Sequence, residues 1–142
     1  MVEKDSIVLT FDVDSDDFTR AGEASSRLKR TLKQMGLPPD IIRRISIVMY
    51  EGEINMVIHA HGGKITVTVD DDAVTMVLAD VGPGIPDVEK AMQAGWSTAS
   101  EAVRQQGFGA GMGLPNMKKN ADTLEIDTVV GVGTTVTAVV RL

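Results

Sequence analysis

Five short runs of β-branched and other apolar residues stand out along the chain, and each has the length of a strand. They cover residues 6–13, 64–70, 73–79, 123–130 and 134–142. The acidic turn 70–72 joins the second run to the third, and Gly131-Val132-Gly133 joins the last two. Each of these pairs therefore predicts a β-hairpin.

Apolar residues recur at helical spacing in four other segments. The first helix is expected over residues 15–36, with Ser15 as its N-cap, and the second over residues 40–59. A short helix is expected after residue 86, and the last over residues 113–120. On the first helix, Leu28 and Leu32 belong either to the core or to a dimer face.

The resulting order is β, α, α, β, β, α, loop, α, β, β, in which strands come in pairs and do not alternate strictly with helices. This order predicts an α+β fold, a two-layer sandwich in which helices cover one face of a mixed, mostly antiparallel sheet of about five strands. A length of 142 residues, 43% of them hydrophobic, suits one well-buried core. We therefore expect a single domain spanning residues 1–142.

Charge and composition exclude several classes of function. The formal net charge is −6, and no cluster of Lys and Arg is longer than a pair, which argues against nucleic acid as a partner. There is no cysteine, and no apolar stretch has membrane-spanning length. The N-terminus lacks the features of a signal peptide. We expect a soluble, cytoplasmic protein that does not bind a membrane.

The helix predicted over residues 40–59 is apolar nearly all round and leaves one narrow polar strip. Arg44, Glu51, Asn55 and His59 fall on this strip. Glu51 and Asn55 are i,i+4 neighbours, so their side chains converge. The carboxylate can accept a proton and the amide oxygen can bind Mg²⁺, which prefers oxygen ligands. The alternative is an ordinary solvated strip.

A second carboxylate on the same helix, Glu53, lies about 200° round the helix axis from Glu51, so it cannot share that site. We interpret Glu53 as a surface or partner-facing charge.

Asp80 ends a predicted buried strand and precedes Val81-Gly82-Pro83-Gly84-Ile85. A carboxylate in this place can accept a hydrogen bond from an exocyclic amine such as adenine N6, and the two glycines let the backbone lie close to a flat ring. The alternative is a common Asx-type turn. The hydroxyl of Thr134, after the last hairpin turn, is able to face the same adenine pocket.

Four alternate glycines occupy the segment Gly107-Phe108-Gly109-Ala110-Gly111-Met112-Gly113, which enters a helix at Leu114. Such a run has a large entropic cost, and it can aim backbone N–H groups at phosphates. It matches neither a Walker loop nor the dinucleotide fingerprint G-x-G-x-x-G. The alternative is a flexible hinge.

These residues resemble the GHKL superfamily of ATPases and kinases, which share the Bergerat ATP-binding fold. Glu51 and Asn55 resemble its N box, and Asp80-x-Gly82-x-Gly84 its first glycine box. The run from Gly107 to Gly113 resembles the second glycine box, and Gly131-x-Gly133-Thr134 the third. The resemblance covers about residues 40 to 142. The leading strand and helix are similar to those of small bacterial anti-sigma-factor serine/threonine kinases and stressosome switch kinases.

The resemblance implies ATP-dependent phosphorylation of a serine or threonine on a small partner protein. Glu51 would be the base that activates the acceptor hydroxyl, Asn55 the Mg²⁺ ligand and Asp80 the reader of adenine. The remaining residues implied to bind nucleotide are Gly82, Gly84, Ile85, Gly107, Gly109, Gly111, Met112, Gly113, Leu114 and Thr134. The implied substrate is a STAS-type antagonist or scaffold protein, with a sigma factor, a phosphatase and a second copy of the chain as further partners.

Two other functions compete with this one. The first is a nucleotide-dependent regulator that sequesters a sigma factor, with little or no kinase activity; Glu51 favours the kinase, since a pure binder needs no base there. The second is the catalytic domain of a histidine kinase, which we do not favour because no helix with an acceptor histidine precedes the predicted domain.

Overall fold

The computed structural model describes residues 6–14, 21–85, 87–92 and 113–142. Most element boundaries agree with the predicted ones to within one or two residues. In chain order the elements are β1 (Ile7–Val13), α1 (Glu23–Gln34), α2 (Pro39–His59), β2 (Gly63–Val69), β3 (Ala73–Asp80), α3 (Val88–Ala91), α5 (Gly113–Asn120), β4 (Thr123–Val129) and β5 (Gly133–Arg141).

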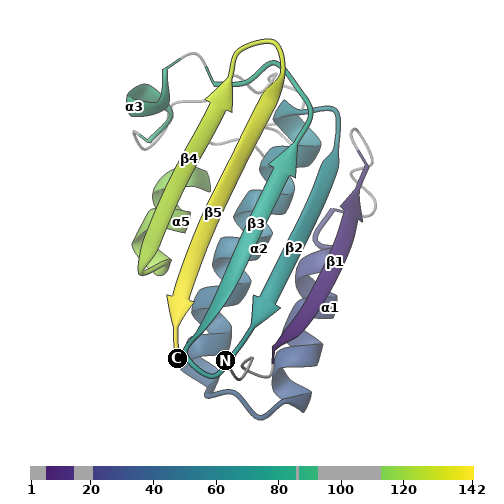
Figure 1. Ribbon diagram of the computed structural model, residues 1–142, viewed down its shortest axis with the longest axis vertical. Coiled ribbons are helices and arrows are strands. Elements are labelled where there is room, and N and C mark those ends of the chain that lie inside the picture. Colours follow the sequence, from purple (N-terminus) through teal and green to yellow (C-terminus); the bar gives the residue numbers. More distant parts are fainter. Residues whose placement is uncertain (1–5, 15–20, 86, 93–112) are drawn as a thin grey trace, which may run out of the picture.

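The strands form one five-stranded sheet in the order β1-β2-β3-β5-β4. Helices α1, α2 and α5 all lie against the same face of this sheet, with α2 in the middle (Figure 1). The predicted α+β, two-layer architecture is confirmed. Each pairing between these strands is antiparallel, so the sheet is more uniform than the mixed sheet that we expected.

The core lies between the sheet and the helices. Along β2 and β3 every second side chain is buried, as expected for strands with one covered face. Leu28 and Leu32 of α1 are fully buried in the same core cluster as Ile65 and Met76. Of the two roles considered for these leucines, the structure therefore assigns the core.

Helix α1 begins at Glu23. Its N-cap is Gly22, which adopts φ +92° and has no side chain to cap the helix. The prediction that Ser15 caps this helix is wrong; Ser15 itself lies outside the described residues. Ser15 was a reasonable candidate, because short polar side chains are favoured at helix N-caps in general. The group that performs this task comes from a different helix.

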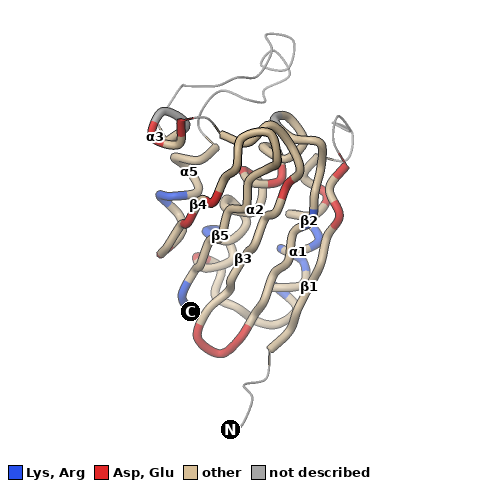
Figure 2. Tube along the Cα trace, turned by 45° about the horizontal axis from the view of Figure 1, so that its top comes forward, with Lys and Arg blue, Asp and Glu red and all other residues tan. Residues whose placement is uncertain are grey.

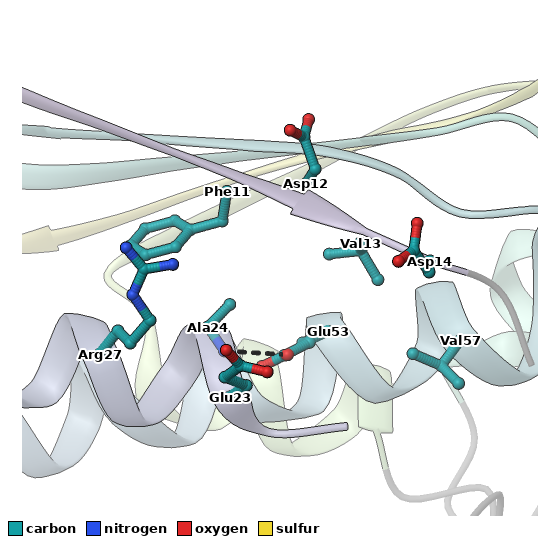
Figure 3. Close-up of a pocket in the computed structure, with 9 residues that line it drawn as sticks. All are labelled: Phe11, Asp12, Val13, Asp14, Glu23, Ala24, Arg27, Glu53 and Val57. Carbon is teal, nitrogen blue, oxygen red and sulfur yellow. Dashed lines mark hydrogen bonds between the residues drawn. The ribbon is translucent and has the colours of Figure 1, made fainter. Parts of the chain in front are cut away.

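That group is Glu53 of α2, which Figure 3 shows beside the first turn of α1. Its carboxylate accepts the backbone N–H of Ala24 at 3.1 Å and that of Ser25 at 3.0 Å, together with the Ser25 hydroxyl at 2.7 Å. Glu53 is only 3% exposed, so its interpretation as a surface charge is wrong. The helical wheel gave its direction correctly, but α1 packs on that side of α2 and covers it.

Charged residues of both signs are spread along the described part of the chain, and the acidic turn Asp70–Asp72 lies at one end of the sheet (Figure 2). Asp80 ends β3 at the opposite end of the sheet, where α3 also lies (Figure 1). Among the described residues, no helix is long and apolar enough to cross a membrane.

Candidate nucleotide site

The predicted polar strip of α2 faces α5. Arg44 donates from Nε to the backbone oxygen of Asn120 at 3.0 Å, and its guanidinium lies 3.3 Å from the Asp122 carboxylate. About two turns further along α2, the side-chain amide of Asn116 lies 3.4 Å from Oε1 of Glu51. The strip is therefore in large part a contact between two helices, and not the solvated surface that was the alternative.

The next member of the strip, Asn55, meets the first residue of α5. A Cβ atom added to Gly113 would lie 2.8 Å from Nδ2 and 3.0 Å from Oδ1 of Asn55. Only glycine allows this approach, so the last glycine of the predicted phosphate-binding run touches the predicted metal ligand. Leu114 follows at 8% exposure and anchors the start of α5 in the core.

The Asn55 amide is half-buried, and within the described part of the chain it forms no hydrogen bond. Among the described residues no buried side-chain nitrogen or oxygen lacks a hydrogen-bond partner, so the Asn55 amide is reached by water and is open to a ligand. An amide oxygen is a suitable ligand for a hard cation. No group of three or more His, Asp or Glu side chains that could hold a metal ion occurs among the described residues.

Four of the predicted phosphate-binding residues, Gly107, Gly109, Gly111 and Met112, lie outside the described residues. Their prediction is not tested by the structure. The side chain of His59, the fourth member of the strip, is not described either.

The loop after β3 rests on the end of α2. His61 donates its backbone N–H to the backbone oxygen of Val81 at 2.7 Å. Gly82 packs closely against Ala60: a Cβ atom added to Gly82 would lie 3.0 Å from the Cα atom of Ala60. Asn55 precedes Ala60 by five residues, which is roughly 7.5 Å along the helix axis. The first glycine motif and the amide of Asn55 therefore lie at the same end of α2.

Asp80 belongs to a chain of hydrogen bonds that includes Thr134. Its Oδ1 accepts the backbone N–H of Thr134 at 2.9 Å, and the hydroxyls of Thr134 and Thr128 lie 2.8 Å apart. The Thr128 hydroxyl in turn accepts the backbone N–H of Ile85 at 2.9 Å. These contacts bring together three predicted nucleotide-binding residues, Asp80, Ile85 and Thr134.

The carboxylate of Asp80 is half-buried. Burial raises the pKa of this carboxyl above 3.8, and the hydrogen bond from Thr134 only partly offsets the effect. Its second oxygen accepts no hydrogen bond from any of the described residues. A partly desolvated acceptor that receives no hydrogen bond from the described residues is suited to the amine of a ligand. Gly84 adopts φ +76° in the adjoining loop.

Two residues in this region were not identified from the sequence. Thr128 links Ile85 to Thr134, and Asn116 contacts Glu51. The position of Asn116, three residues after Gly113, was a usable signal, because residues three apart share one face of a helix. For Thr128 the pairing with Thr134 across the last hairpin was the corresponding signal.

Several curated proteins are similar to this chain. An anti-sigma F factor of Caldanaerobacter subterraneus subsp. tengcongensis is 37% identical over 100 residues, which cover 67% of this chain and 66% of that protein, slightly under two thirds of its length. The serine/threonine-protein kinase RsbT of Bacillus subtilis is 31% identical over 121 residues, 82% of this chain and 85% of that protein. An anti-sigma F factor of Bacillus licheniformis is 32% identical over 111 residues, 74% of this chain and 73% of that protein.

The model of one protein family, described as a histidine kinase-like ATPase domain, matches residues 15–140. The match includes α2, the loop after β3, α5 and the last hairpin, which are the elements that carry the site described above. An ATPase domain binds ATP, in agreement with the nucleotide expected from the sequence. The chain therefore belongs to the family of histidine kinase-like ATPase domains.

Proposed function

We propose that this chain is an ATP-dependent protein serine/threonine kinase of the partner-switching type, acting as a single domain in the cytoplasm. The observation that carries the proposal is the pair Glu51 and Asn55 on one strip of α2, with Asn116 and Gly113 of α5 against them. The relatives named as a serine/threonine-protein kinase and as anti-sigma F factors support the same class.

In the proposed reaction Glu51 accepts the proton of a serine or threonine hydroxyl on the partner protein. The hydroxyl oxygen forms a bond to the γ-phosphorus of ATP while the bond from that phosphorus to ADP breaks. An ionised carboxylate within hydrogen-bond reach of the hydroxyl can take its proton.

Asn55 is proposed to hold Mg²⁺ through its amide oxygen. A bound Mg²⁺ neutralises charge on the phosphates and orients them for transfer. The fit rests on the half-buried amide without a hydrogen-bond partner among the described residues. Since the described residues offer no cluster of acidic ligands, the remaining ligands are expected to be phosphate oxygens and water.

Asp80 is proposed to accept a hydrogen bond from the adenine amine through Oδ2, while Oδ1 stays bound to Thr134. Gly82, Gly84 and Ile85 form the loop beside this carboxylate, and the segment from Gly107 to Gly113 is proposed to bind the phosphates. The expected phosphate acceptor is a STAS-type antagonist or scaffold protein.

The decisive experiment is incubation of the chain with γ-labelled ATP, Mg²⁺ and the purified proteins encoded by neighbouring genes. We expect one of them to become labelled on a serine or threonine, and Glu51→Ala to reduce the labelling to a small residual rate while ATP still binds. Full labelling by Glu51→Ala would contradict the assignment of the base.

A second function is favoured by the names of the relatives, most of which are anti-sigma F factors. In this alternative the chain sequesters a sigma factor, and ATP sets its conformation. ATP binding and capture of a sigma factor, without label on any partner protein, would support this function over the kinase.

A further inference from the structure

Helix α5 contacts Glu51 and Asn55 with one of its faces. Gly113 and Asn116 are three residues apart on α5, and Asn55 and Glu51 are four residues apart on α2, so each pair lies on a single face of its helix. Gly113 meets Asn55, Asn116 meets Glu51, and Asn120 meets Arg44, so the two helices run antiparallel. The position of α5 thus determines what surrounds both side chains.

The contact between Asn116 and Glu51 involves one carboxylate oxygen. Nδ2 of Asn116 lies 3.4 Å from Oε1 of Glu51, and both side chains are half-buried. Within the part of the chain that the structure describes, this is the one hydrogen bond of the Glu51 carboxylate. Oε2 is therefore the oxygen that remains for a ligand.

A glutamate needs such a contact if its carboxylate is to keep one orientation. Its terminal torsion is broad, so an uncontacted carboxylate samples many orientations. A base must come within about 2.6–3.2 Å of the hydroxyl, and distances in a ligand-free site are often longer than in the reacting complex. A donor on α5 restricts the carboxylate without removing its second oxygen.

We propose that Asn116 is a positioning residue for Glu51: it donates a hydrogen bond to Oε1 and so directs Oε2 toward the acceptor hydroxyl. This inference rests on the proposed kinase function and deepens it. It also links the base to Gly113, because Asn116 and Gly113 both lie in the first turn of α5.

The test compares Asn116→Ala with Lys119→Ala, an exposed position on the same helix. For Asn116→Ala we expect kcat for phosphotransfer to fall on the order of tenfold, since misplacing a reacting group by about 1 Å has large effects on rate. KM for ATP and for the partner protein should change by less than about twofold, because Asn116 is not proposed to bind either. Lys119→Ala should leave all three unchanged.

A double-mutant cycle separates positioning from a general structural role. In the Glu51→Ala background, which has no carboxylate to direct, Asn116→Ala should cause no further loss of residual activity. A loss of the same size in both backgrounds would overturn the inference, and so would an unchanged kcat in the single variant.

A measurement without phosphotransfer tests the contact itself. In ¹H–¹⁵N spectra the side-chain amide signals of Asn116 should shift in Glu51→Ala and stay in place in Glu125→Ala, which changes an exposed carboxylate on β4. Unmoved signals in Glu51→Ala would overturn the inference. If the signals respond but neither the wild type nor Lys119→Ala transfers phosphate to any partner, the kinase function is what fails, and the catalytic purpose of the contact fails with it.

Discussion

The carboxylate of Asp80 is only partly exposed to water. Burial penalises the charged form more than the Thr134 hydrogen bond favours it, so the pKa of Asp80 is raised. The folded state then binds the proton more tightly than the unfolded state. Stability is accordingly lost as the pH rises from about 3.8 through the raised pKa of the folded state. A carboxylate whose pKa is shifted by burial beside a ligand loop is a candidate for a binding role, as proposed above for adenine.

Asp80→Asn should therefore raise the free energy of unfolding at neutral pH, because the amide keeps an oxygen for the Thr134 N–H and carries no charge. The advantage over the wild type should shrink as the pH falls toward 3.8. Urea unfolding of both proteins across this range measures it. ATP affinity should fall on the order of tenfold or more, because the proposed adenine contact loses a charged acceptor. A variant that is less stable at neutral pH and binds ATP normally would contradict both expectations.

Gly113 has a role that depends on its neighbour. In Gly113→Ala the new methyl group would lie 2.8 Å from the Asn55 amide and displace it. We expect the Mg²⁺-dependent part of ATP affinity, measured by titration calorimetry with and without Mg²⁺, to fall on the order of tenfold. Added to Asn55→Ala, which removes the amide, the same change should cause no further loss of the Mg²⁺-dependent part of the affinity. An additional loss in that background would show that Gly113 acts independently of Asn55.

Side chains of helix α2 bind one end of each of the two neighbouring helices, α1 and α5. Glu53 binds the N–H groups at the start of α1, and Arg44 binds the last carbonyl of α5. In each case the charge opposes the partial charge of the helix end that it meets. A buried glutamate without donors would be unfavourable, but three donors converge on this one.

Glu53→Ala leaves two backbone N–H groups of α1 without an acceptor, and we expect it to reduce the free energy of unfolding by about 2–4 kcal/mol. Glu53→Gln keeps one acceptor and should lose about half as much. Glu125→Ala, an exposed carboxylate on β4, is the matched control and should change stability by less than about 0.5 kcal/mol. Urea unfolding gives all three values. Equal stability of Glu53→Ala and Glu125→Ala would refute the capping role.

The molecule as a whole gathers the end of α2, the start of α5 and the loop after β3 at one end of the sheet (Figure 1). A ligand that binds all three elements is a cross-link between parts of the chain that are distant in sequence. Its binding energy adds directly to the stability of the folded state.

Mg²⁺ with ATP should therefore raise the melting temperature, by an amount equivalent to about 2.7 kcal/mol at a ligand concentration of 100 times Kd. Chelation of Mg²⁺ and the variant Asn55→Ala should each remove the metal-dependent part of this increase, while Glu51→Ala should keep it. Differential scanning fluorimetry is the measurement. A full response of Asn55→Ala to Mg²⁺ would exclude Asn55 as its ligand.

Helix α2 and the hairpins were predictable from the sequence because their signals are local. The apolar pattern of residues 40–59 and the turns at 70–72 and 131–133 identify these elements without knowledge of their neighbours. The polar strip was predictable for the same reason. The neighbours of each side chain were not predictable. The helical wheel placed Glu51 and Asn55 together, but it gave no sign that α1 covers the side of α2 that carries Glu53.

Three consecutive residues of α2 point to three different neighbours. Glu51 faces α5, Gly52 packs against Leu78 of the sheet, and Glu53 faces α1. Inserting or deleting one residue upstream in this helix would turn all three by about 100° and direct a carboxylate at apolar strand residues. Length changes among relatives should therefore fall in the loops, and the spacing from Arg44 to Asn55 should tolerate none.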